Sequence, residues 1–136
     1  SINHITDAAK LQRVFERVAL FTEPGGLFLF DVNTPYKHRQ VLADNTFVYE
    51  LPGLYCVWQN SLKGDKIEIA LDFFEQQDDG HWLRSSEQFA ERAYPRQKLC
   101  DMLKQAGFGV RAVYADGTTV PPGGDTQREV YVAVRR

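Results

Sequence analysis

The 136-residue sequence lacks the features that mark several common classes of protein. Its two cysteines, Cys56 and Cys100, are too few for a disulfide framework and too scattered for a zinc site, which favours a reducing, cytoplasmic environment. Its 16 Lys and Arg residues are outnumbered by 18 Asp and Glu residues, so it has no basic excess for binding nucleic acid. Its longest apolar runs, near 18–21 and 27–30, are too short to cross a bilayer. We therefore expect a soluble protein without nucleic-acid or membrane partners.

What remains is the composition of an ordinary globular domain. Hydrophobic residues make up 43% of the chain and charged residues 25%, close to globular averages, and the length suits one domain. The chain opens with Ser1-Ile2-Asn3-His4, which has neither an initiator methionine nor the pattern of a signal peptide. We expect from this opening that the chain begins partway through a domain.

The first 45 residues predict a helix followed by a strand. Apolar residues recur at helical spacing from Asp7 to Phe21, and Pro24-Gly25-Gly26 interrupts the pattern. The unbroken apolar run from Leu27 to Val32 is typical of a parallel strand covered on both faces. Asp31 and Asn33 come at its carboxyl end, which is where open α/β sheets bind ligands.

The middle of the chain has a different pattern. From Thr46 to Arg92 about three strands are predicted, separated by turns at 63–65 and 78–80, with one strand alternating strictly between apolar and polar residues. We interpret this segment as an antiparallel meander. The remainder predicts a helix that begins near Pro95 and ends at Gly107, a strand, a loop over 118–127 and a final strand.

This order of elements resembles the latter half of a class I S-adenosylmethionine-dependent methyltransferase. The resemblance covers the whole chain, and its order is more specific than any one motif. The segments that carry it are Ser1–Asp7, Pro24–Asn33, Tyr94–Leu103, Gly107-Phe108 and Arg128–Ala133.

The resemblance implies an α/β fold, the C-terminal part of a Rossmann-like methyltransferase sheet with an antiparallel β-meander insert. The fifth, sixth and seventh strands of that sheet would be 27–32, 108–115 and 128–134, with the seventh antiparallel and Ser1–Asn3 at the tip of the fourth. The chain would be a single partial domain, with 1–45 and 93–136 as the core and 46–92 as a substrate-covering lid.

The resemblance also implies S-adenosylmethionine as the cofactor of the complete enzyme. By position, Ser1, Ile2, Asn3 and His4 would line its methionine end. The sequence has no G-x-G-x-x-G loop with which a backbone could approach a cofactor, so we expect this chain alone to bind it weakly or not at all and to be inactive. No catalytic residue is assigned, because methyl transfer depends chiefly on orientation and His4 has no evident carboxylate partner in the sequence.

Substrate-binding candidates fall into two groups. Asp31, Asn33 and Tyr36 could orient a polar substrate, although Asn33-Thr34-Pro35 is equally suited to a strand exit. The insert supplies aromatic rings that could cover a small, partly apolar molecule or could merely pack together. These rings are Tyr49, Tyr55, Trp58, Phe74 and Trp82.

The favoured function is methyl transfer to a small molecule in a closed pocket. The alternative is a non-catalytic binding or assembly domain that forms a homodimer through the insert or the exposed sheet edge at 27–32. A nicotinamide oxidoreductase is a weaker alternative. We expect His38 and His81 at the surface, no metal site, and both cysteines as packing residues.

Overall fold

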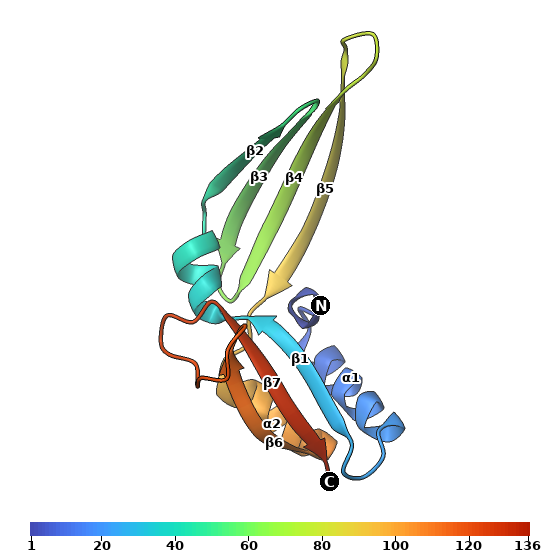
Figure 1. The fold of residues 1–136 in the computed structure, drawn as a ribbon, viewed down its shortest axis with the longest axis vertical. Helices are drawn as coiled ribbons and strands as arrows, with labels where there is room; N and C mark the ends of the chain where they lie inside the picture. Colours follow the sequence, from blue (N-terminus) through green and yellow to red (C-terminus); the bar gives the residue numbers. More distant parts are fainter.

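The computed structural model describes residues 1–136. It has an elongated shape, because its two sheets lie end to end along the long axis (Figure 1). A three-stranded sheet with two helices forms one end, and a four-stranded antiparallel sheet projects from it. The elements in chain order are η1 (Ile2–His4), α1 (Ala8–Phe21), β1 (Leu27–Asn33), η2 (Lys37–Leu42), β2 (Thr46–Leu51), β3 (Leu54–Lys63), β4 (Lys66–Gln76), β5 (Trp82–Arg92), α2 (Arg96–Ala106), β6 (Phe108–Ala115) and β7 (Arg128–Arg135).

The three-stranded sheet has the order β1-β7-β6. β7 is antiparallel to both neighbours, so β1 and β6 run in the same direction on either side of it. The pairing with β1 runs from Leu27 opposite Val134 to Asn33 opposite Arg128. This arrangement confirms the predicted α/β fold with an antiparallel final strand.

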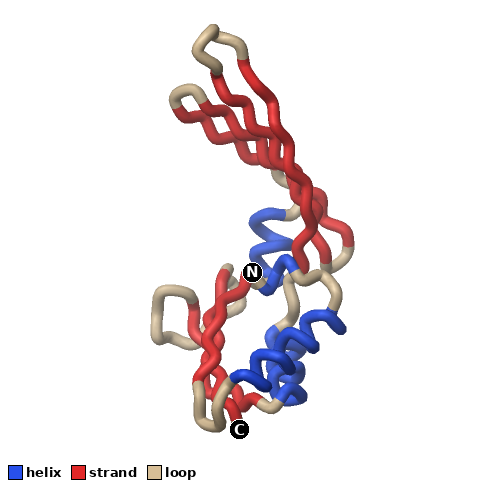
Figure 2. Tube along the Cα trace, turned by 90° about the vertical axis from the view of Figure 1, so that its right-hand side faces the viewer, coloured by secondary structure: helices blue, strands red, loops and turns tan.

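Both helices pack on one face of this sheet, as the side view in Figure 2 shows. Phe28, Phe30 and Val32 of β1 therefore point into the core, whereas Leu27 and Leu29 are each 56% exposed on the other face. The prediction that this strand is covered on both faces was wrong for this chain. The sequence run is apolar throughout, but only one layer of helices is present to cover it.

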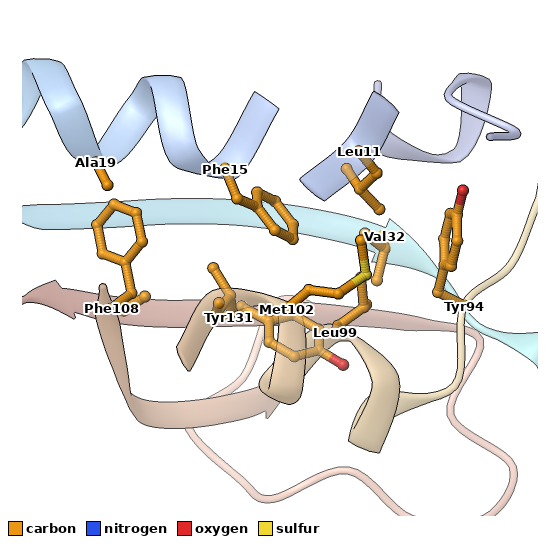
Figure 3. Packing of buried hydrophobic residues seen from close by; sticks show 11 residues of the cluster. Leu11, Phe15, Ala19, Val32, Tyr94, Leu99, Met102, Phe108 and Tyr131 are labelled. Carbon is orange, nitrogen blue, oxygen red and sulfur yellow. The ribbon is translucent and has the colours of Figure 1, made fainter. Parts of the chain in front are cut away.

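The core lies between the helices and the sheet (Figure 3). Leu11, Phe15 and Ala19 of α1 face Phe108 and Tyr131 across this interior. The Phe30 ring stacks on the Tyr131 ring with centroids 5.0 Å apart. Spacing of three and four residues along α1 places its apolar side chains in one row, which is the periodicity that predicted the helix.

The ends of both helices follow from their sequences. Asp7 caps α1, where its carboxylate accepts a hydrogen bond from the Ala9 backbone N–H at 2.8 Å. Gly107 ends α2 with a φ of 100°, a left-handed conformation that glycine adopts without steric cost.

The four-stranded sheet, Thr46–Arg92, is called the insert below. Its strands pair in the order β2-β3-β4-β5, one strand more than the sequence pattern predicts. The face of the insert that packs on η2 is called its concave face below. It carries a small core around Leu42, Ile67 and Ile69. No helix in the chain has the length and apolar character required to span a bilayer.

Two segments differ from the sequence predictions. Ser1–Asn3 does not continue a strand, because Ile2–His4 forms a 3₁₀ turn that lies at the free edge of β1. The segment Lys37–Leu42 forms a short π-helix that buries His38, which we expected at the surface. The reason is that η2 lies under the insert, which covers its inner side.

Candidate functional site

A cavity of about 210 Å³ lies where the carboxyl end of β1 meets the concave face of the insert. We call it the junction cavity. Its walls are mostly apolar, and its polar groups come from β1, η2 and β5. The lining residues are Asn33, Lys37, Leu42, Trp58, Ile69, Leu71, Phe89 and Glu91.

Asn3 connects the free edge of β1 to the base of the insert. Its side-chain Nδ2 donates to the carbonyl oxygens of Asn33 at 3.1 Å and Arg92 at 3.2 Å. Its Oδ1 accepts from the Asn33 backbone N–H at 2.9 Å. The Asn3 amide thus takes the place that a neighbouring strand would have at this end of β1, and it fixes the position of β5 above the cavity.

Glu91 lies between two histidines at the base of the insert. Its Oε1 is 3.2 Å from His4 Nε2 and its Oε2 is 3.4 Å from His38 Nε2. The His38 side chain is only 2% exposed, so the prediction that it lies at the surface was wrong. His4 also has the carboxylate partner that the sequence did not reveal, because residues 4 and 91 meet only in the folded chain.

The two histidines have different surroundings. The His4 side chain is 51% exposed, and its ring stacks on Phe89 with centroids 5.3 Å apart. His38 is enclosed, and neither of its ring nitrogens has a partner with hydrogen-bond geometry, although its Nε2 lies 3.4 Å from Glu91 Oε2. The neighbouring His38 lowers the pKa of Glu91 below its ordinary value, despite the opposing effect of burial, with smaller contributions from His4 and Lys37. Glu91 is therefore an anion at neutral pH.

The polar residues at the end of β1 have unequal access to the cavity. Asn33 reaches it, and its Oδ1 accepts from Lys37 Nζ at 3.3 Å and Arg128 Nη1 at 3.1 Å. Asp31 points to the uncovered face of the sheet, where Arg128 pairs with it. Tyr36 is 37% exposed and precedes η2.

The aromatic candidates of the insert lie on opposite faces. Trp58 and Tyr49 share the concave face, where their rings are 6.4 Å apart, and Trp58 lines the junction cavity. Tyr55 and Trp82 lie on the other face, because the strand register places Tyr55 beside Phe74 and Trp82 beside Gln76. A separate hollow of about 470 Å³ borders this second set. The five rings therefore do not form one pocket.

The four residues expected at the cofactor also differ in what they expose. Ile2 packs against the core, and both Asn3 donors are occupied within the chain. Only Ser1 and His4 present polar groups outward. Of these four residues, two are therefore occupied by contacts within the chain.

The cavity residues that sequence reasoning missed are Lys37, Leu42, Ile69, Leu71, Phe89 and Glu91. Phe89 and Glu91 lie two residues apart in β5 and so share one face of the strand, but the sequence around them does not show which face meets the core. Nothing in the sequence indicated that Glu91 approaches His4.

No family model matches the chain. It is 27% identical over 135 residues to a Bacillus subtilis protein named "Putative methyltransferase YqeM", covering 98% of this chain and 54% of that protein. It is 29% identical over 136 residues to "Putative methyltransferase GWCH70_2453" of a Geobacillus species, with coverage of 98% and 55%. The chain thus spans about half the length of the curated relatives it matches.

The solved structures agree with these relatives. An S-adenosylmethionine-dependent methyltransferase from Clostridium acetobutylicum matches with a TM-score of 0.91 and 28% identity, over 99% of this chain and 55% of that one. The resemblance to class I methyltransferases is therefore confirmed.

Proposed function

We propose that this chain is the acceptor-binding half of an enzyme that transfers a methyl group from S-adenosylmethionine to a small molecule. The observation that carries the proposal is the junction cavity, which is lined on one side by the insert and lies at the carboxyl end of β1, where α/β sheets bind ligands. The proposal is also supported by the two curated relatives, which are about twice as long as this chain and are named as methyltransferases.

The cavity has the chemistry of an orienting pocket. Trp58, Leu71 and Phe89 give it apolar and aromatic walls, while Asn33 and Glu91 offer polar groups for fixing one end of a ligand. Bound S-adenosylmethionine supplies an electrophilic methyl group, and an acceptor reacts fastest when its nucleophilic atom is held in line with that group and shielded from water. We assign this holding and shielding to the junction cavity, with the insert as its lid.

We assign cofactor binding to a part of the complete protein that lies outside this chain. Ser1 and His4 would lie at the boundary between that part and this chain. The free thiols of Cys56 and Cys100 suit a reducing compartment, so we place the protein in the cytoplasm.

The direct test uses the complete protein with S-adenosylmethionine labelled in its methyl group and an ultrafiltered cell extract as the source of acceptors. We expect label in the small-molecule fraction. Label found only in protein or nucleic acid, or no transfer at all, would contradict the proposal.

Two tryptophan variants localise the acceptor. Trp58→Ala removes a wall of the junction cavity and should reduce transfer about 10-fold or more through lost orientation. Trp82→Ala is the matched control, because Trp82 lies on the opposite face of the insert and 50% of it is exposed. Equal losses in both variants would show that the acceptor does not bind on the concave face.

A further inference from the structure

We propose that the junction cavity binds its acceptor molecule by a carboxylate group, which pairs with the Lys37 ammonium and accepts a hydrogen bond from the Asn33 side-chain amide. This inference rests on the proposed function and names its substrate class, a small organic acid that receives the methyl group at another atom. The observation that carries it is the pair of donor groups that η2 and β1 bring together in the cavity lining, where Lys37 Nζ lies 3.3 Å from Asn33 Oδ1.

Lys37 is the cation of the cavity lining, and it has no counter-ion within the chain. None of the ion pairs in the structure includes it. Glu91, the other charged residue of the lining, has a histidine nitrogen within 3.4 Å of each of its carboxylate oxygens. The Lys37 ammonium has three N–H donors and uses one of them on Asn33, so two remain for a ligand.

The orientation of the Asn33 amide follows from its neighbours. Lys37 Nζ and Arg128 Nη1 can only donate hydrogen bonds, and they lie 3.3 Å and 3.1 Å from the same atom, so that atom is the amide oxygen. Nδ2 is therefore the other end of the amide, and it donates to no group of the chain. Lys37 and Asn33 thus have only donors left to offer, and a carboxylate, whose oxygens only accept, is their complement.

The backbone at the start of η2 favours a carboxylate over a phosphate. Phosphate sites commonly use several free backbone N–H groups at the start of a helix. Here the Lys37 N–H donates to Thr34 Oγ1 at 3.2 Å, and the His38 N–H donates to the Thr34 carbonyl oxygen at 3.2 Å. One ammonium and one side-chain amide remain, which suit a singly charged group.

The rest of the cavity sets the direction and the size of the ligand. Glu91 of β5 repels a second anion, so the carboxylate lies at η2 and the apolar part of the acid lies against Trp58 and Phe89 of the insert. The cavity volume of about 210 Å³ is below the range of about 300–1,000 Å³ that drug-sized ligands need. Because donors hold the carboxylate oxygens, the methyl group goes to a different atom of the acid.

The test is calorimetric titration of the complete protein at pH 7 with three probes of similar shape, which are benzoate, benzamide and phenyl phosphate. Benzoate should bind about 10-fold more tightly than benzamide, because a hydrogen bond to a charged group stabilises a complex by about that factor or more. Phenyl phosphate should bind more weakly than benzoate. Benzoate should also inhibit methyl transfer in competition with acceptors from the ultrafiltered extract.

Two variants locate the charge that binds the carboxylate. Lys37→Gln should lower the affinity for benzoate about 10-fold and leave the affinity for benzamide unchanged, which also shows that the cavity is intact. Arg39→Gln is the matched control, because it removes the same charge from η2 at an exposed position outside the cavity lining. Its affinity for benzoate should equal that of the wild type.

The outcomes separate this inference from the proposed function. Binding of benzoate through Lys37 by a protein that transfers no methyl group overturns the proposed function and leaves the carboxylate site standing. Equal affinities for benzoate and benzamide, or equal losses in Lys37→Gln and Arg39→Gln, overturn the carboxylate site and leave methyl transfer standing. Tighter binding of phenyl phosphate overturns the choice of a carboxylate. A labelled product that releases methanol in mild alkali is a methyl ester and overturns the assignment of the carboxylate as the anchor.

Discussion

At the scale of single residues, a few buried polar side chains join the two sheets. Asn3 is 2% exposed and Glu91 is 8% exposed, and both lie where the base of the insert meets the end of β1. Buried polar groups cost free energy unless they are paired, so such residues specify one arrangement of the two parts. The geometry of the junction cavity depends on them.

Asn3→Ala should be strongly destabilising. The change removes three hydrogen bonds and leaves the Asn33 N–H and two carbonyl oxygens without partners, at a cost of about 3 kcal/mol. Urea unfolding measures this loss. Asn45→Ala is the control, because the exposed Asn45 amide donates only to the Val41 carbonyl, and its cost should stay below about 1 kcal/mol. Similar small values for both variants would contradict the role of Asn3.

Glu91 should make stability depend on acid pH. Its pKa in the folded chain is lowered from an ordinary 4.5, so its stabilising contribution is fully present above that value and is lost as the pH falls through the lowered folded pKa. The free energy of unfolding, measured from pH 6 to pH 3, should therefore fall more steeply in the wild type than in Glu91→Gln. Parallel curves would show that the folded chain does not favour the carboxylate.

Sequence reasoning found part of this site. Asn33 was predicted at a ligand-binding strand end and reaches the cavity, and His4 was selected from its position in the family order. Glu91 was missed because its interactions with His4 and His38 join segments far apart in the chain. His38 looked solvated because its flanking lysine and arginine suggest surface, whereas the covering strands of the insert decide its burial.

At the scale of elements, local signals predicted most of the structure. The helices over Ala8–Phe21 and Arg96–Ala106 were predicted by apolar spacing and by their end residues. The exposure of one face of β1 was not predicted, because an apolar run does not reveal whether helices cover one face of the strand or both. The separate strand Thr46–Leu51 was missed because Phe47, Val48 and Tyr49 follow one another and so fall on both faces, which leaves no period-two contrast in the sequence.

The end of α2 offers a test at this scale. Gly107→Ala places a side chain at a φ of 100°, and its Cβ would approach Arg135 Nη1 to 2.8 Å. The left-handed backbone alone costs an alanine about 1–2 kcal/mol, so thermal unfolding should shift to lower temperature.

Gly124→Ala is the comparison for this variant. A Cβ at Gly124 would meet no atom within 4 Å, and the φ of this residue is not left-handed, so the substitution should be close to neutral. Equal effects of the two substitutions would show that the conformation at Gly107 is not required.

At the scale of the whole molecule, the outer edge of β1 and one face of the three-stranded sheet are open. β1 pairs only with β7, and Leu27 and Leu29 are exposed beside its free edge. Unpaired strand edges with apolar side chains associate readily. We therefore expect the 136-residue chain to self-associate with rising concentration in sedimentation experiments.

A double variant tests which surface is responsible. Leu27→Lys combined with Leu29→Lys places two charges beside the edge and should shift the chain toward monomer. A dimer that persists unchanged would instead implicate the insert, whose opposite face carries Tyr55 and Trp82.

The proposed division between acceptor binding in this chain and cofactor binding outside it can be tested by calorimetric titration with S-adenosylmethionine. We predict that the complete protein binds with micromolar affinity, a free energy of about −8 kcal/mol, and that the 136-residue chain shows no measurable binding. Micromolar binding to the 136-residue chain alone would contradict this division, because the chain would then form its cofactor pocket from its own residues.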